Sequence, residues 1–169
     1  LITLLLFLIM LPAGAKTLTG GVVYTVESAR KAAFEGIEYE ISMEPFKKYM
    51  TDPGFISPAK TEGGKPKVSK KGRRVVWFSS GNYGVIYYKN PILGYLYNKN
   101  GQLIYIEIST NTTFPYIQKK YDVAGNLVGV GLVVEKNESF VYTIDKKMIA
   151  HWVGNVRYDE QGNVVGFRK

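Results

Sequence analysis

A short pattern recurs through the second half of this chain and limits its fold more than any other feature. In each copy an aromatic residue stands four positions before a glycine, and an aliphatic residue stands two positions after it. Three copies are complete: Tyr97, Gly101 and Leu103; Tyr121, Gly125 and Leu127; and Tyr158, Gly162 and Val164. Two weaker copies share the frame: Trp77, Gly81 and Tyr83; and Tyr142, Lys146 and Met148. The centres at 81, 101, 125, 146 and 162 are 20, 24, 21 and 16 residues apart, about one β-hairpin each.

The spacing within a copy has a physical reason. A three-residue hairpin loop such as 123–125 ends in a left-handed residue, and glycine is least strained in that conformation. Tyr121 and Leu127 then lie directly opposite each other as a cross-strand pair. With regular strands, the next pairs on that face would be Tyr95 with Tyr105, Lys119 with Gly129, and Val156 with Gly166. Lys146 would be strained in such a loop, so a different turn type at that position stays open.

Residues 77 to 167 resemble the short tandem hairpin repeats written Y-D-x-x-G-x-L. These include the YD repeats of large bacterial surface proteins and the MORN-variant repeats of small bacterial proteins. The three complete copies carry the resemblance, whereas the two weaker ones lack the Asp or the Gly. The resemblance implies an extended β-sheet with an interaction role and no catalytic mechanism.

Residues 16–43, before the repeat, predict a strand, a helix and a second strand. Apolar residues alternate at Leu18, Val22, Tyr24 and Val26, and again at Ile37, Tyr39, Ile41 and Met43. Between these runs, Thr25 is placed to cap a helix and Gly36 to end it. With a hairpin-repeat meander over 75–169, the fold class is α+β and mostly β. We expect one short N-terminal helix packed on an antiparallel β-meander built from about five hairpins.

The first fifteen residues have the composition of an export signal. Leu1 to Leu11 are apolar except for Thr3, and Ala13, Gly14 and Ala15 form an A-x-A cleavage pattern. We therefore predict a signal peptide over 1–15 and a single domain over 16–169. An uncleaved anchor is the alternative, although the apolar run is shorter than the roughly 20 residues of a spanning helix. With no cysteine in the chain, a secreted or periplasmic, bacterial protein is expected, with no transmembrane span after cleavage.

Residues 44–74 break the strand pattern and predict a long basic loop rich in Gly and Pro. The part from 60 to 74 carries seven cations against Glu62, and so holds +6 of the net charge of +8. The cations are Lys60, Lys65, Lys67, Lys70, Lys71, Arg73 and Arg74. The remaining chain is nearly balanced, so the charge points to one local anionic partner. Nucleic acid is not expected as the partner of an exported protein.

Residues that carry catalysis or bind metals are scarce. The chain has no cysteine and a single histidine, His151, which lies beside Trp152 in a predicted strand and is interpreted as structural. Glu38 and Glu40 share one strand face and are interpreted as a solvated surface. We therefore predict no enzyme, no metal site and no cofactor; a small hydrolase is the third choice among the functions considered.

Tyrosine is the unusual residue, with 13 of 169 positions. It is either strand filler that pairs across hairpins or an aromatic platform for a partner. The leading hypothesis is an exported, non-enzymatic binding domain that contacts a protein or envelope polymer through a Tyr-rich sheet and the basic loop. Its predicted site residues are Tyr87, Tyr88, Tyr95, Lys65, Lys67, Lys70, Lys71, Arg73 and Arg74. The alternative is a structural or inhibitor-like envelope protein that acts by edge-strand pairing.

Overall fold

The computed structural model describes residues 23–56 and 67–167. Its elements are α1 (Val26–Phe34), the 3₁₀ helix η1 (Glu44–Tyr49), β1 (Phe55–Ile56), β2 (Lys67–Val68), β3 (Arg73–Trp77), β4 (Tyr83–Tyr87), β5 (Leu93–Tyr97), β6 (Leu103–Ser109), β7 (Tyr116–Asp122), β8 (Leu127–Glu135), β9 (Glu138–Tyr142), β10 (Met148–Val153), β11 (Val156–Tyr158) and β12 (Val164–Phe167). The strands β3 to β12 form one antiparallel sheet in sequence order, and β1 pairs with β2. The prediction of a mostly β, antiparallel meander is confirmed.

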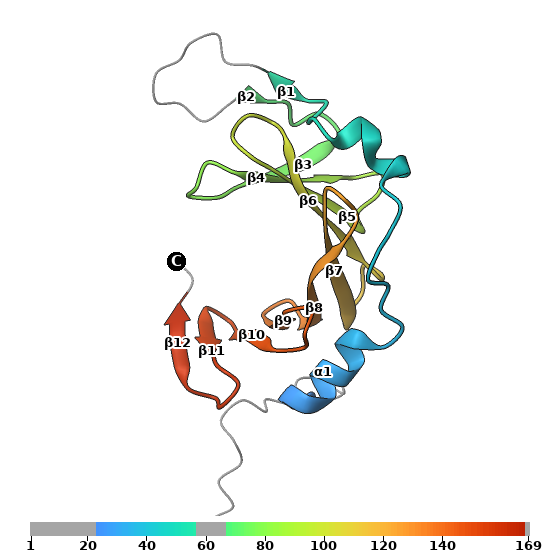
Figure 1. Ribbon diagram of the computed structural model, residues 1–169. Coiled ribbons are helices and arrows are strands. Elements are labelled where there is room, and N and C mark those ends of the chain that lie inside the picture. Colours follow the sequence, from blue (N-terminus) through green and yellow to red (C-terminus); the bar gives the residue numbers. More distant parts are fainter. Residues whose placement is uncertain (1–22, 57–66, 168–169) are drawn as a thin grey trace, which may run out of the picture.

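The ten-stranded sheet is curled into an open arc (Figure 1). Helix α1 and the segment that leads from it to β1 run along the outer side of this arc. The repeat marks the five turns at one end of the strands, and the connections at the other end, such as 136–137, follow no common pattern. The sheet thus has an outer face, which the N-terminal segment covers, and an inner face on the concave side of the arc.

All five repeat turns adopt the same backbone conformation. The central residue is left-handed in each, with φ of 82° at Gly81, 77° at Gly101, 93° at Gly125, 65° at Lys146 and 85° at Gly162. The Lys146 N–H donates to the Thr143 carbonyl at 3.0 Å, as Gly125 does to Asp122 at 3.1 Å. Lys146 therefore shares the turn type, and the alternative of a different turn there is wrong.

The cross-strand pairs next to the turns lie where the spacing predicts them. Their partners are Trp77 with Tyr83, Tyr97 with Leu103, Tyr121 with Leu127, Tyr142 with Met148, and Tyr158 with Val164. The pairs expected beyond them are wrong by one residue: Tyr105 faces Leu96, Gly129 faces Lys120, and Gly166 faces Arg157. A β-bulge beside the turn inserts one extra residue on the second strand and shifts the register.

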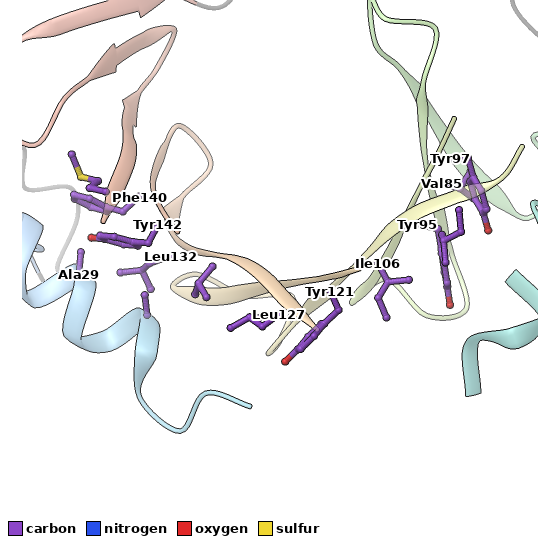
Figure 2. Packing of buried hydrophobic residues seen from close by; sticks show 14 of the residues in the cluster. Ala29, Val85, Tyr95, Tyr97, Ile106, Tyr121, Leu127, Leu132, Phe140 and Tyr142 are labelled. Atoms are coloured by element: carbon purple, nitrogen blue, oxygen red, sulfur yellow. The ribbon is translucent and has the colours of Figure 1, made fainter. Parts of the chain in front are cut away.

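Buried side chains project from the outer face of the sheet, the side on which α1 lies (Figure 2). The row Val85, Tyr95, Ile106, Tyr121 and Leu127 runs across five neighbouring strands. Several of the tyrosines in the core bind the segment that covers them: the Tyr121 hydroxyl donates to the Glu38 carbonyl at 2.9 Å, and Tyr142 donates to Val26 at 3.1 Å. The repeat tyrosine therefore supplies both apolar area and a hydrogen bond to its cover.

Helix α1 begins and ends as predicted. The Thr25 hydroxyl accepts the Ser28 N–H at 3.1 Å, and the Ser28 hydroxyl accepts the Thr25 N–H at 2.9 Å, so the two residues form a capping box. Gly36 follows the helix with φ of 60°. Ala29 and Ala33 are completely buried, and their small side chains let the helix lie close to β8 and β9.

Of the predicted strand-helix-strand arrangement of 16–43, the helix is present, but the two strands are not found where the structure describes these residues. Residues 23–25 are not a strand, and the earlier residues, with the predicted signal peptide, lie outside the described residues. Residues 37–43 form only an isolated bridge, between Glu40 and Asn126, and cross the tip of the β7–β8 hairpin instead of adding a strand to the sheet. The Ile41 N–H donates to the Gly125 carbonyl at 2.9 Å, and the Leu127 N–H donates to the Tyr39 carbonyl at 2.7 Å. Alternation alone does not distinguish these two arrangements, because both bury one side of an extended chain.

The long loop predicted over 44–74 contains more structure than expected. It contains the 3₁₀ helix η1, and the short pair β1–β2 follows this helix. Asp52 forms a buried ion pair with Arg73, which opens β3. This ion pair fixes the loop to the edge of the sheet. No helix within the described ranges is long and apolar enough to cross a membrane.

Candidate binding face

The inner face of the sheet is defined by the residues that alternate with the core. One row across it is Arg74, Ile86, Gly94, Glu107, Lys120 and Gly129. The next row is Val76, Gly84, Leu96, Tyr105 and Asp122. A further row is Tyr116, Val133, Ser139, Trp152, Arg157 and Gly166. Charged and aromatic side chains are mixed on this face, whereas the outer face is largely apolar.

Glycine is concentrated on the inner face. Its strand positions there are Gly84, Gly94, Gly129, Gly131 and Gly166. Side chains on the concave side of a curled sheet converge, so residues without a side chain relieve the crowding and permit the curl. Of these five glycines, Gly129 is buried and the other four are half-buried.

A polar cluster occupies the middle of the inner face. The Gln118 amide donates to Glu107 at 3.1 Å, and the Lys120 Nζ lies 3.6 Å from the same carboxylate. The Lys120 ammonium also lies 4.2 Å from the centre of the Tyr105 ring. This cation–π contact orients Tyr105 on an exposed face. The cluster thus fixes its own side chains and leaves little net charge in the centre.

Charged groups from different strands of the inner face act on Tyr116. Burial raises the pKa of Tyr116, and the Glu107 charge raises it further, while the charge of Arg74 acts to lower it. Arg74 is on β3 and Tyr116 is on β7, with three strands between them. A ligand on this part of the inner face would therefore meet charges from more than one strand.

Four of the predicted site residues lie near one another where β3 begins and β4 ends. Lys70, Lys71, Arg74 and Tyr88 are exposed, and the Tyr88 N–H donates to the Gly72 carbonyl at 3.2 Å. We call these four residues the basic corner. Tyr88 is 68 % exposed, and among the described residues none of the three cations forms an ion pair.

The other predicted site residues are not part of this corner. Tyr95 and Arg73 are buried and Tyr87 is half-buried, so the prediction of a contact surface is wrong for Tyr95 and Arg73. Lys67 is exposed on β2, and Lys65 lies outside the described residues. Tyr87 and Tyr88 are neighbours and fall on opposite faces of the sheet, but nothing in the sequence showed which of the two faces is covered.

Arg73 has a structural role with Asp52. The Asp52 carboxylate accepts the Tyr83 hydroxyl at 2.8 Å and the Gly54 N–H at 2.9 Å, besides its ion pair with Arg73. Burial acts to lower the pKa of Arg73, but the hydrogen bond and charge of Asp52 outweigh it and raise that pKa. Burial and the same carboxylate raise the pKa of Tyr83. This group holds the loop and is sealed from solvent, so it offers nothing to a ligand.

The comparisons with models of protein families, with curated proteins and with solved structures find no match to this chain. The functional argument therefore depends on the site itself.

His151 is structural, as interpreted from the sequence. It is buried, accepts or donates a hydrogen bond with Glu138 at 2.8 Å, and stacks on Phe140 with 4.0 Å between the ring centres. Within the described part of the chain, no group of three or more His, Cys, Asp or Glu residues is arranged to hold a metal ion.

A groove beside α1 has a volume of about 380 Å³ and is lined by Glu27, Arg30, Lys31, Phe34, Glu35 and Lys146. Its charges are of both signs, and Arg30 is already paired with Glu27 and Glu160. Arg30 also donates to the Lys146 carbonyl at 3.0 Å. These contacts join α1 to the β9–β10 and β11–β12 turns. The groove is therefore the place where the helix packs against these two turns.

A smaller hollow on the inner face was missed from the sequence. It has a volume of about 150 Å³ and is lined by Phe78, Ser80, Asn82, Leu96 and Tyr105. Phe78 is on the inner side because it follows Trp77, whose side chain packs with Tyr83 on the outer face. The signal in the sequence that could have found it is that Gly84 and Gly94 fall at positions that face the same side of the sheet. Glycines on one side mark the face on which side chains are least crowded.

Proposed function

We propose that the protein is an exported, non-enzymatic binding domain that holds an anionic polymer against the inner face of its sheet, with the basic corner as anchor. The observation that supports this most directly is the basic corner itself. An exposed aromatic ring stands there beside cations that no acidic residue of the described chain neutralises.

The corner is well ordered for a surface cluster. The Arg73 N–H donates to the Lys70 carbonyl at 3.2 Å and closes the turn that carries Lys71, while Arg74 stands on β3. Cations held on a fixed backbone lose less conformational freedom on binding than cations on a flexible chain. Aromatic and basic residues are also the types that dominate binding surfaces.

A polymer is favoured over a compact protein partner because the contact surface continues from the corner along the inner face. Arg74 on β3 begins a row that reaches Glu107 on β6 and Lys120 on β7. An extended chain could follow this row, whereas a globular partner would have to enter the concave side of the arc. The N-terminal sequence pattern supports export, which would make the partner a component of the cell envelope.

The proposal is tested by replacing Lys70, Lys71 and Arg74 together with Ser. Binding of the protein to isolated cell envelopes should fall at least tenfold, and the melting temperature should stay near that of the wild type. Wild-type binding should also weaken with added salt, because exposed charges are screened within about 8 Å at physiological ionic strength. Lys99, Lys136 and Lys147, which are exposed elsewhere, provide the matched control when all three are changed to Ser. Equal losses in both triple variants would mean that net charge matters and the corner does not.

A second candidate function, edge-strand pairing with a partner, is favoured by β12. This edge strand carries Val164, Val165 and Phe167 at 52 %, 49 % and 72 % exposure. It has no charged residue or proline, the usual protection of a sheet edge. Val165→Lys should abolish such pairing and leave binding at the basic corner intact. Unchanged partner capture by this variant would exclude the edge.

A further inference from the structure

We infer that the hollow between Phe78 and Tyr105 is a subsite for one sugar ring, so that the polymer of the proposed function is an acidic polysaccharide. This inference rests on the proposed function, because it names the class of polymer held on the same face. The evidence is the size of the hollow, the chemistry of its lining and its position relative to the basic corner.

The size of the hollow suits one unit of a chain. Its volume of about 150 Å³ is below the roughly 300–1,000 Å³ of pockets that enclose a whole small ligand. It is also open to solvent, since Phe78 is about half exposed. A site of this size holds one residue of a longer molecule and leaves both neighbouring residues outside.

The lining combines aromatic rings with small polar groups. Phe78 and Tyr105 offer ring faces, Leu96 is apolar, and Ser80 and Asn82 offer a hydroxyl and an amide. A sugar ring has apolar C–H faces and hydroxyl groups around its edge, so it can satisfy both kinds of surface. An apolar peptide side chain would cover the rings but would leave the polar groups without a partner from the ligand.

Tyr105 is held in place before any ligand arrives. Lys120 lies over its ring, Glu107 holds Lys120, and Gln118 holds Glu107. Opposite it, Phe78 lies over Gly84, where a Cβ would come within 3.7 Å of the Phe78 ring. This is an ordinary van der Waals distance, so Phe78 packs directly on the backbone at Gly84.

The distance to the basic corner explains why the ligand is acidic and extended. Phe78 follows Arg74 by four residues, which corresponds to about 13 Å along an extended strand. One molecule that fills the hollow and also reaches the cations must therefore be longer than one sugar unit and must carry negative charge. An acidic polysaccharide meets both conditions.

The test uses calorimetric titration of the full-length protein with three soluble polymers of similar length. Polygalacturonate carries sugar rings and charge, poly-L-glutamate carries charge alone, and dextran carries sugar rings alone. Polygalacturonate should bind at least tenfold more tightly than poly-L-glutamate. Phe78→Ala should remove this difference and leave the binding of poly-L-glutamate unchanged. Phe167→Ala, which removes an exposed ring at β12, should change neither affinity.

Several outcomes separate this inference from the proposed function. Equal affinity for the two polyanions, or full polygalacturonate affinity in Phe78→Ala, would overturn the sugar subsite and leave the anionic anchor standing. Dextran binding that depends on Phe78, without binding of either polyanion, would overturn the anchor and the acidic character of the ligand. Binding of none of the three would overturn both. Tyr105→Leu, checked by its melting temperature, gives an independent second variant if Phe78→Ala folds poorly.

Discussion

The carbonyl oxygen of Ile41 occupies the space that a Cβ would need at position 125, and the Ile41 N–H donates to the Gly125 carbonyl at 2.9 Å. Glycine is thus required at position 125 for two reasons: the turn is left-handed there, and the segment 37–43 approaches the backbone closely. At Gly81, with φ of 82°, the nearest obstacle to a Cβ is the Lys99 side chain at 3.8 Å, an ordinary contact.

This difference predicts unequal costs for the same substitution. Gly81→Ala should lower the free energy of unfolding by roughly 1–2 kcal/mol, the cost of a left-handed alanine. Gly125→Ala should cost clearly more, because the 37–43 segment must also move away from the hairpin. Chemical denaturation of both variants measures the two values. Equal losses would show that the contact with Ile41 contributes nothing.

Lys146 takes the place of glycine in the fourth turn and has φ of 65°. Lys146→Gly should therefore raise the melting temperature by a few degrees, since relief of about 1 kcal/mol corresponds to roughly 2–4 °C in a domain of this size. The side chain lost in this variant lies 5.6 Å from the Phe34 ring. A lower melting temperature would mean that this cation–π contact outweighs the backbone strain.

Two core tyrosines should respond differently to removal of their hydroxyl groups. The Tyr121 hydroxyl donates to the Glu38 carbonyl, whereas the Tyr97 hydroxyl is buried with no hydrogen-bond partner among the described residues. Tyr121→Phe should cost about 1 kcal/mol, and Tyr97→Phe should be neutral or stabilising. Thermal and denaturant unfolding of the two variants tests this, and each Tyr→Phe variant is the control for the other. A loss at position 97 as large as at 121 would contradict the assignment.

Acid should weaken the repeat turns. Partial burial acts to raise the pKa of Asp122, but hydrogen bonds from Asn126, Ala124 and Gly125 outweigh it and lower that pKa. The lowered pKa of Asp159 comes first from the Asn163 side chain and then from backbone N–H groups. Both carboxyls thus have a lower pKa folded than unfolded. Their contribution to stability is complete above the unfolded pKa, near 3.9, and is lost as pH falls through the folded pKa.

The variant Asp122→Asn with Asp159→Asn should consequently show a smaller fall in melting temperature between about pH 5 and about pH 2 than the wild type. Its turns should still form, because Asn98 accepts the Gln102 N–H at 3.0 Å in the second repeat turn. An identical acid response in the variant and the wild type would place the acid sensitivity in other carboxyl groups.

The turns of this fold could be predicted from the sequence because they depend on neighbours. The frame at Gly125 and the cap at Thr25 each follow from residues within a few positions. The bulges that follow four of the repeat turns, all except the turn between β3 and β4, could not be predicted. The apolar residue that such a bulge inserts, for example Val128, reads as part of a regular strand. The same limit explains why residues 37–43 were expected to be a strand.

The candidate site was predicted in part, for a related reason. Residue types pointed to the basic loop and to Tyr88, which the structure brings together. The pairing of Arg73 with Asp52, 21 residues apart, could not be foreseen, and it removes one cation from the surface. The hollow at Phe78 and Tyr105 depends on β3 and β6, which are separated by two strands in the sheet, and local patterns do not reveal such distances.

The order of the strands in the sheet has a consequence for how the chain acquires its fold. Every strand from β3 to β12 pairs with its neighbour in sequence, so each hairpin can close without waiting for a distant segment, which favours fast folding. Residues 23–56 are the exception: their contacts lie on turns and strands made much later from the same chain. During synthesis this segment emerges before the strands that it covers. It is therefore expected to dock last, on the outer face of a sheet that the later residues have already formed.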